Sequence, residues 1–320
     1  MFKQLFVQVV EIAREAKLIK MGTIAIDGTK MKANASKRKA MSYERMLSDE
    51  KRLREEIGKL TRAAKKQDDI DDDSFGPDFR GDELPAEIER REDRLKVIAA
   101  AMKRLERRKA QEAKAKQEAA PKGEAAKKGK DAKPEPKDQM NFTDPESRIM
   151  RTSGKSYDQC YNAQAAVDAT KQIIVAGSVG QSSSDNGQLL PVLNQACENT
   201  KIAPKRVLAD AGYKKESDFA ELEAMDIDAY VSVGRESKAA KQPKKEQPLT
   251  SAMRKKLKTK RGRTHYKKRK HIVEPVFGWL KHVLGFRAFS LRGLRKVAGE
   301  WDLVCMALNL RRMASMKVQL

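Results

Sequence analysis

Three acidic residues occupy positions from which they could together hold a divalent metal ion. Asp27 ends an alternating, β-branched run that begins at Met21 (MGTIAID), and Asp210 ends a short apolar run (RVLAD). Both runs are typical of strands, and the loops at the carboxyl ends of strands usually form the site of an α/β sheet. Glu274 lies on a predicted helix that begins near Ile272. Converging carboxylates repel one another unless a cation lies between them, and their hard oxygen atoms select Mg²⁺ or Mn²⁺.

Two such ions, about 3.5–4 Å apart, can activate a water or a 3′-hydroxyl and stabilise the leaving oxygen in phosphodiester cleavage. In this interpretation Asp27 bridges both ions, and Asp210 and Glu274 each complete one coordination shell. The alternative is structural, because an Asp after a strand is more often a turn or cap residue, and the chain has 45 acidic residues. Three further aspartates are interpreted as turn residues: Asp144, Asp168 and Asp185. The residues alone do not name the reaction.

The positive charge of the chain is concentrated in one stretch. The 320 residues include 68 Lys and Arg against 45 Asp and Glu, a net charge of +23. The 36 residues from 235 to 270 contain 16 basic and two acidic side chains, and thus 14 of these 23 charges. Such an excess requires a polyanion to neutralise it, and nucleic acid is the commonest partner of this kind. An ordinary soluble protein with Lys-rich helices is the alternative.

The order of the predicted elements indicates an α/β domain with a mixed sheet and flanking helices. An amphipathic helix over residues 2–18 precedes the strand that ends at Asp27. Two strands within 156–180 are joined by a turn at 169–171. The remaining elements are a helix over 189–196, the strand ending at Asp210, a helix over 216–225, a strand over 228–234 and a last helix over 294–316.

An antiparallel helical hairpin is predicted as an insertion into this domain at residues 42–109. Apolar residues recur at three–four spacing in two segments that flank a polar, acidic loop, which is the pattern of a coiled-coil pair. Residues 110–139 contain too few apolar groups to pack and are predicted to be a disordered charged linker. The expected divisions are 1–41 with the first strand, 42–109, 110–139, and 140–320, which includes the basic stretch 235–270.

Several classes of site are disfavoured. Three widely spaced cysteines without CxxC spacing are expected to be reduced thiols, and the three histidines make a Cys/His zinc site improbable. No apolar run approaches the roughly 20 residues of a membrane span, and the N-terminus lacks the order of a signal peptide. We therefore expect a cytoplasmic protein with no membrane partner.

Five segments resemble, in the same order, the DDE transposases of bacterial insertion sequences: IAIDGTKMKANASKRKAMSYERM, TDPESRIM, YNAQAAVDA, LADAGY and YKKRKHIVEPVFGWLKHVLGFRAFSLRGLRKV. The resemblance covers nearly the whole chain. It implies a ribonuclease-H-like catalytic domain whose first acid lies on the first strand, the second after the fourth strand and the third on a helix. The matching residues are Asp27 in DGT, Asp210 in DAGY and Glu274 in VEPVFG, and they would bind two Mg²⁺ (or Mn²⁺) ions.

The family signature around the third acid is Tyr-x2-Arg-x3-Glu-x6-Lys, and Lys281 fits its last position. Tyr266 and Arg269 have the expected mutual spacing, but Arg269 lies five residues before Glu274, and Lys270 lies four before it. Which of these two basic residues meets a phosphate stays open, and Lys281 has the alternative of being a solvated surface lysine. Because Pro275 suits only a first helical turn, Glu274 is predicted at a helix start, where the helix dipole favours its charge.

The resemblance also implies DNA contacts, for which the candidates are Tyr266, Arg269, Lys270, Lys281, Arg287 and Arg292, with the run 254–270 as further phosphate contacts. Trp279 is expected either to stack on a base or to pack in the core.

The implied function is metal-dependent DNA cleavage and strand transfer at the terminal inverted repeats of an insertion sequence, by a nucleoid-associated protein that is a homodimer on DNA. The hairpin would be an assembly or DNA-contacting arm. Such transposases usually carry a further N-terminal region, so the helix over 2–18 is interpreted as the end of a missing segment. The rival hypotheses are a truncated, catalytically silent DNA-binding remnant and a related nuclease that cuts without joining.

Overall fold

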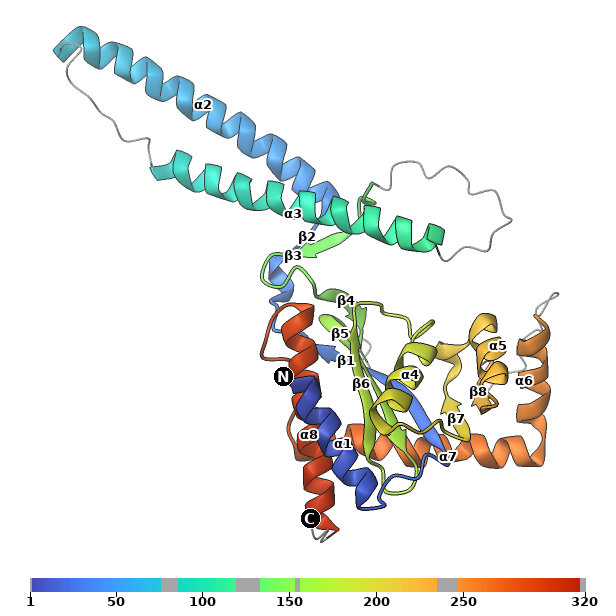
Figure 1. Ribbon diagram of the computed structural model, residues 1–320. Helices are drawn as coiled ribbons and strands as arrows, with labels where there is room; N and C mark the ends of the chain where they lie inside the picture. Colours follow the sequence, from blue (N-terminus) through green and yellow to red (C-terminus); the bar gives the residue numbers. More distant parts are fainter. Residues whose placement is uncertain (1, 76–85, 119–132, 153–155, 235–246, 317–320) are drawn as a thin grey trace. The chain divides into compact units, whose positions relative to one another are not determined.

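The protein is described by a computed structural model over residues 2–75, 86–118, 133–152, 156–234 and 247–316 (Figure 1). The chain divides into two compact units. Unit 1 consists of Met1–Ala35 and Glu146–Leu320, and unit 2 is Ser36–Pro145. The carboxylates expected to form a site, Asp27, Asp210 and Glu274, all belong to unit 1.

Unit 1 is built on a mixed sheet, which has six strands among the described residues. Its central strand β1 (Ile24–Lys32) pairs antiparallel with β5 (Tyr157–Asp168) and parallel with β7 (Arg206–Ala209). Beyond β7 lies β8 (Asp228–Val231), again parallel. β6 (Ile174–Gly180) and β4 (Arg148–Arg151) pair with successive parts of the outer edge of β5. The antiparallel strands β6, β5 and β1, followed by β7 and β8 parallel to β1, with β4 added at the edge of β5 and with flanking helices, confirm the predicted ribonuclease-H-like α/β fold.

The β5–β6 hairpin forms as predicted. Apart from its first two residues, β5 is buried along its whole length, because helices cover both faces of the sheet. At the turn, Asp168 Oδ1 accepts a hydrogen bond from Thr170 N (2.8 Å), and its Oδ2 accepts one from Met21 N (2.8 Å). Asp168 is therefore a turn residue, as predicted, and it also fixes the chain just before β1.

Helices pack on the sheet and its edge. α7 (Lys260–Gly278) contacts β1, β5, β7 and β8, and α4 (Leu189–Thr200) contacts β1, β5 and β6. α8 (Leu294–Ser315) packs on β6 and on α1 (Phe2–Glu15). Fully buried Trp301 of α8 donates its Nε1 proton to the carbonyl of Gln164 (3.0 Å), which fastens α8 to β5. Two shorter helices, α5 (Glu216–Ala224) and α6 (Pro248–Lys258), contact β8.

Two predicted boundaries are wrong. β1 does not end at Asp27 but continues to Lys32, because β5 pairs with it over its full length, up to Lys32 opposite Cys160. α7 begins at Lys260 and not near residue 272, because Thr259 caps it: its Oγ1 accepts a hydrogen bond from Gly262 N (2.9 Å). The described part of the basic stretch is thus helical.

Unit 2 contains the helical hairpin, formed by α2 (Tyr43–Phe75) and α3 (Ala86–Glu118). At its base β2 (Ala40–Ser42) pairs antiparallel with β3 (Gln139–Asn141), and the short 3₁₀ turn η1 (Lys37–Lys39) precedes β2. A separate apolar core joins the two helices and the strands: Met41, Met46, Leu53, Ile98, Ala101, Leu105 and Met140. Of the predicted linker 110–139, residues 110–118 continue α3, and 119–132 lie outside the described residues.

No helix in the described ranges combines the length and the apolar character needed to cross a membrane. All three cysteines are described, and each is a free thiol, as predicted. Burial raises the pKa of the Cys160 thiol to about 11.

Candidate active site

Asp27 lies on the central strand and faces α7. Its Oδ2 is 2.8 Å from Nη1 of Arg269 in α7. Thr29, two residues further along the strand, accepts a hydrogen bond from Nζ of Lys281 (2.6 Å), which lies in the π-helical turn η3 (Trp279–Val283) that continues α7. Side chains two residues apart share a face of a strand. Asp27 and Thr29 therefore point to the face that α7 crosses.

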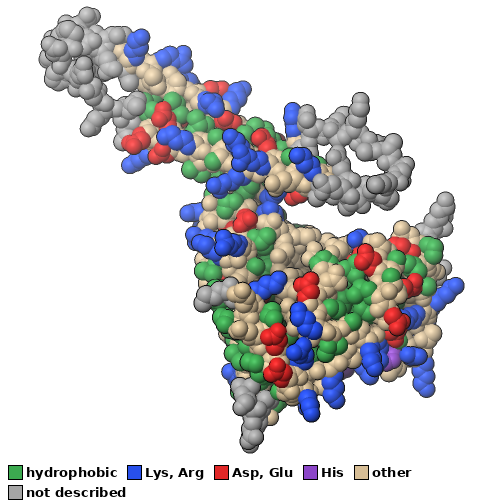
Figure 2. Space-filling model, viewed as in Figure 1, with side chains coloured by type: hydrophobic (Ala, Val, Ile, Leu, Met, Phe, Trp, Pro, Cys, Tyr) green, Lys and Arg blue, Asp and Glu red, His purple; other side chains and the backbone are tan. Residues whose placement is uncertain are grey.

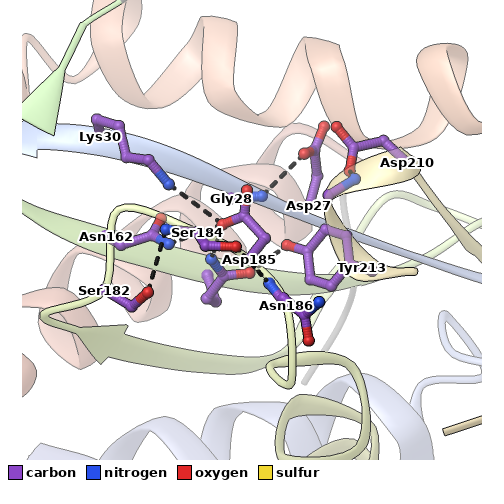
Figure 3. Close-up of polar contacts among 12 residues, drawn as sticks. Asp27, Gly28, Lys30, Asn162, Ser182, Ser184, Asp185, Asn186, Asp210 and Tyr213 are labelled. Atoms are coloured by element: carbon purple, nitrogen blue, oxygen red, sulfur yellow. Dashed lines mark hydrogen bonds and ion pairs between the residues drawn. The ribbon is translucent and has the colours of Figure 1, made fainter. Parts of the chain in front are cut away.

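Asp210 follows β7 directly and lies beside Asp27. Ala25 is paired with Leu208 in the parallel register, and two more residues along both strands bring Asp27 level with Asp210. Asp210 caps the 3₁₀ turn η2 (Ala211–Tyr213), with Oδ1 accepting from Gly212 N (2.8 Å). In Figure 3 the carboxylates of Asp27 and Asp210 approach one another at their tips. The strands thus bring together two of the three predicted acids.

The pKa of Asp27 is raised by burial and by the acids beside it. Burial raises its pKa to about 6, and the charges of Asp210 and Asp185 raise it as well. Arg269 opposes this rise, and so does the hydrogen bond from Gly28 N to Asp27 Oδ1 (2.9 Å). Arg269 therefore offsets only part of the effect of burial and of the neighbouring acids, and a cation bound at Asp27 would lower its pKa further.

The basic residues of the predicted signature reach this site. Arg269 is buried, with 9% of its surface exposed, and its Nε has no hydrogen-bond partner among the described residues. Lys281 is half-buried, and burial lowers its pKa, with the charge of Arg287 acting in the same direction. Lys281 is therefore not a solvated surface lysine. Lys270, in contrast, is exposed. Of the two residues left open by the shifted spacing, Arg269 is the one at the acidic pair.

Glu274 lies inside α7, so its predicted position at a helix start is wrong. The helix continues through Pro275, which cannot donate a hydrogen bond to the carbonyl of His271. That carbonyl instead accepts a hydrogen bond from Nε2 of Gln172 (2.7 Å), in the β5–β6 turn. A tertiary contact from a residue distant in the sequence thus compensates for the proline.

The Glu274 side chain is exposed, and it forms no ion pair with any described residue. The structure therefore does not bring it to the acidic pair. Its helix is nevertheless held close to β1 on both sides of it. Arg269, five residues earlier, bonds to Asp27, and Lys281, seven residues later, bonds to Thr29.

Asp185, interpreted from the sequence as a turn residue, belongs to the same site. Its Oδ1 accepts hydrogen bonds from Nζ of Lys30 (3.2 Å), Nδ2 of Asn162 (2.7 Å) and Nε2 of Gln164 (2.8 Å) (Figure 3). The Gln164 side chain also accepts a hydrogen bond from the hydroxyl of buried Tyr213. The residues that donate these hydrogen bonds come from β1, β5 and the turn after β7. The membership of Asp185 in the site therefore could not be predicted from the local sequence around it.

Two glycines allow the carboxylates to approach the backbone. A Cβ at Gly212 would lie 3.0 Å from Oδ1 of Asp210 and 3.1 Å from Oδ2 of Asp185. A Cβ at Gly28 would lie 2.9 Å from Oδ1 of Asp185 and would overlap the Gln164 amide. A side chain at Gly28 would force the Gln164 amide to move, and one at Gly212 would displace the neighbouring carboxylates by a few tenths of an ångström.

Comparison with known protein families agrees with this geometry. Residues 132–310 match the family model described as Transposase DDE domain, which is more than half of the chain. The chain belongs to this family. The match includes Asp185, Asp210, Arg269 and Glu274, whereas Asp27 lies before it and joins the site through the sheet. No curated protein matches the sequence.

The acidic side chains of this transposase provide some, but not all, of the protein ligands expected for a divalent metal ion. Asp27 and Asp210 offer paired hard oxygen ligands, and the pKa of Asp27 is raised by burial and by the charge of Asp210, which a bound cation would counteract. Within the described ranges, however, no three Asp, Glu, His or Cys side chains are close enough together to hold an ion. The described residues thus offer an ion the two carboxylates of this pair.

The other residues predicted to contact DNA differ in burial and in their contacts. Tyr266 is half-buried on α7, with its ring centroid 6.0 Å from the guanidinium carbon of Arg269. Exposed Arg287 bonds to the Lys281 carbonyl (3.2 Å) and His282 Nδ1 (3.0 Å), and exposed Arg292 bonds to Asn34. The ring of Trp279 is covered by Arg312 at 4.1 Å, so it packs against the protein.

Proposed function

We infer that this chain is an insertion-sequence transposase that cleaves DNA at the terminal inverted repeats of its element and joins the 3′-hydroxyls to target DNA. The observation that carries the proposal is the placement of Asp27 and Asp210 side by side on neighbouring strands, next to buried Arg269, whose Nε has no hydrogen-bond partner among the described residues. Membership of the DDE family supports DNA as the substrate.

Asp27, Asp210 and Glu274 would hold the metal, with Glu274 reaching the pair from the edge of α7. Two Mg²⁺ or Mn²⁺ ions, when bound, supply the activation of the attacking hydroxyl and the stabilisation of the leaving oxygen. Arg269 and Lys281 would orient the scissile phosphate, because both place positive charge beside Asp27 and Thr29. Tyr266, Lys270, Arg287 and Arg292 would position the flanking DNA.

Two element ends must be handled together, so the active species on DNA would be a homodimer, associated with the nucleoid in the cytoplasm. The hairpin of unit 2 would serve as an assembly or DNA-contacting arm.

The test is a strand-transfer assay with the purified protein, Mg²⁺ and labelled terminal repeats from the DNA that flanks the gene. Cleaved ends and joined products are expected. Asp27→Asn, Asp210→Asn and Glu274→Gln should each lower the rate at least 1000-fold, whereas Glu221→Gln, on the exposed surface of α5, should not. Cleavage without joining would instead identify a nuclease. DNA binding without cleavage would identify a silent remnant, and full activity of Glu274→Gln would refute its assignment as the third acid.

A further inference from the structure

A basic cleft adjoins the acidic pair at the carboxyl end of the sheet. It has a volume of about 480 Å³ and lies where β8 ends, under the facing sides of α6 and α7. Its floor is formed by the chain at 232–234 and by Leu257, and Tyr266 forms part of its wall. Four cationic side chains surround it: Arg254, Lys258, Arg263 and Lys267. Pockets of this size accept small organic groups.

The register of the sheet places this cleft next to the candidate active site. Ala209 pairs with Val231 in the parallel register, so the next residues, Asp210 and Ser232, lie side by side. Ser232 N also donates to the carbonyl of Ala209 (3.2 Å). Asp27, Asp210 and Ser232 thus form a row across three strands, with a step of about 4.8 Å between neighbours. Tyr266 separates the cleft from Arg269.

Three of the four cationic side chains around the cleft form no ion pair within the described part of the chain. On the other side of the same helices, Lys256 and Arg261 form ion pairs with Asp228 (2.6 and 3.9 Å). Among the described residues, no carboxylate pairs with Lys258, Arg263 or Lys267. Figure 2 shows Lys and Arg side chains gathered along the edge of unit 1 that Figure 1 assigns to α7. Unpaired cations around a hollow are the features of an anion site.

We propose that this cleft binds a backbone phosphate of the DNA strand within about three nucleotides of the scissile bond. This inference rests on the proposed function and adds a phosphate site to it. The limit of three nucleotides follows from the sheet, since the cleft begins about 5 Å from Asp210 and successive phosphates of one strand advance about 3.4 Å along the axis of a duplex. Lys258 and Arg263 approach the phosphate from α6 and α7, and Tyr266 packs against the adjoining sugar. The contact adds affinity and register without reading the base sequence.

The experiment measures DNA binding by fluorescence anisotropy against salt, with the full chain, a terminal-repeat duplex and EDTA, so that no cleavage occurs. Each phosphate contact contributes about 0.9 to the slope of log K against log salt. The double variant Lys258→Ala/Arg263→Ala should lower the slope by about one. The matched control is Lys20→Ala/Lys205→Ala, two exposed lysines just before β1 and β7, at the opposite end of the sheet. It should leave the slope unchanged.

A second measurement places the phosphate. Neutral methylphosphonate linkages are introduced singly along the strand. One within three nucleotides of the cut should weaken binding of the parent protein about tenfold and leave binding of the double variant unchanged. Equal slopes in the double variant and the control would overturn the proposal. The proposal would also be overturned if methylphosphonate linkages had no effect on DNA binding, even if line broadening in ³¹P NMR showed that the cleft binds inorganic phosphate. In that case the cleft would bind free phosphate but not the DNA backbone. Because neither measurement requires catalysis, failure of strand transfer alone would count against the proposed function and not against the cleft.

Discussion

The raised pKa of Asp27 makes a prediction about the stability of the protein. In the folded state this pKa is about 6, against 3.8 for an unperturbed aspartate. The folded state therefore binds more protons than the unfolded state in this window, and the free energy of unfolding decreases as the pH rises through it. Well above pH 6 the carboxylate is ionised in both states, and its burial lowers the free energy of unfolding by the full amount. Asp27→Asn removes the titrating group, so the variant should lack this part of the pH dependence.

The magnitude follows from the two pKa values. Their difference of about 2.2 units, at 1.36 kcal/mol each, corresponds to about 3 kcal/mol over the whole window. Between pH 4.5 and 7.5 about 2 kcal/mol of this is expressed, because at pH 4.5 the unfolded carboxyl is already mostly ionised. The side chain is 19% exposed, so solvent screening reduces this value only slightly. The attraction between Arg269 and the ionised carboxylate is already contained in the folded-state pKa, so its loss in the variant adds no separate pH-dependent contribution.

The assay is urea unfolding of the parent and Asp27→Asn at pH 4.5 and 7.5, in EDTA. Relative to the parent, the variant should gain about 2 kcal/mol between the two pH values. Glu198→Gln, an exposed acid on α4, is the matched control and should follow the parent. Asp210→Asn should reduce the slope in part, because the charge of Asp210 contributes to the raised pKa. Identical slopes for the parent and Asp27→Asn would refute the electrostatic account of the acidic pair.

Three further changes test other parts of the structure. Burial raises the pKa of Asp302 to about 6, so its ionised carboxylate destabilises the folded state above that pH. Asp302→Asn should therefore raise the free energy of unfolding at pH 7.5 by up to about 3 kcal/mol. At pH 4 the same substitution should leave it nearly unchanged. Gln172→Ala should cost about 1 kcal/mol in urea unfolding, and less in a Pro275→Ala background, where the His271 carbonyl regains its helical partner. Gly212→Ala should slow single-turnover DNA cleavage at least tenfold, because its Cβ displaces the Asp210 carboxylate.

Much of the fold could be predicted from local pattern. The β5–β6 hairpin, the strand before Asp210 and the last helix follow directly from alternation and helical spacing. The two aspartates of the pair could be found for the same reason, since both lie on or directly after buried strands. The exact end of β1 could not be predicted, because its extension past Asp27 depends on the length of β5 and not on the residues of β1.

Other features depend on contacts between distant residues. A proline at 275 predicts a helix start, and it is compatible with a helix interior only because Gln172, about a hundred residues earlier, satisfies the carbonyl that it leaves free. Asp185 lies in a segment of Ser, Asn and Gly residues, which are typical of a turn. Its place in the site comes from Lys30, Asn162 and Gln164, which the antiparallel pairing of β1 with β5 aligns on one face.

The spacing around the third acid has a geometric consequence. Residues of an α-helix advance about 100° each, so Glu274 lies about 140° around α7 from Arg269, whereas the four-residue spacing of the family signature would give about 40°. With Arg269 buried against Asp27, the extra residue turns Glu274 toward solvent, as its exposure shows. Because the π-helical turn after α7 still returns Lys281 to Thr29, the helix remains anchored on both sides of Glu274. In the proposed mechanism, the Glu274 side chain, or one helical turn between these anchors, would move to complete the metal site while the sheet stays in place.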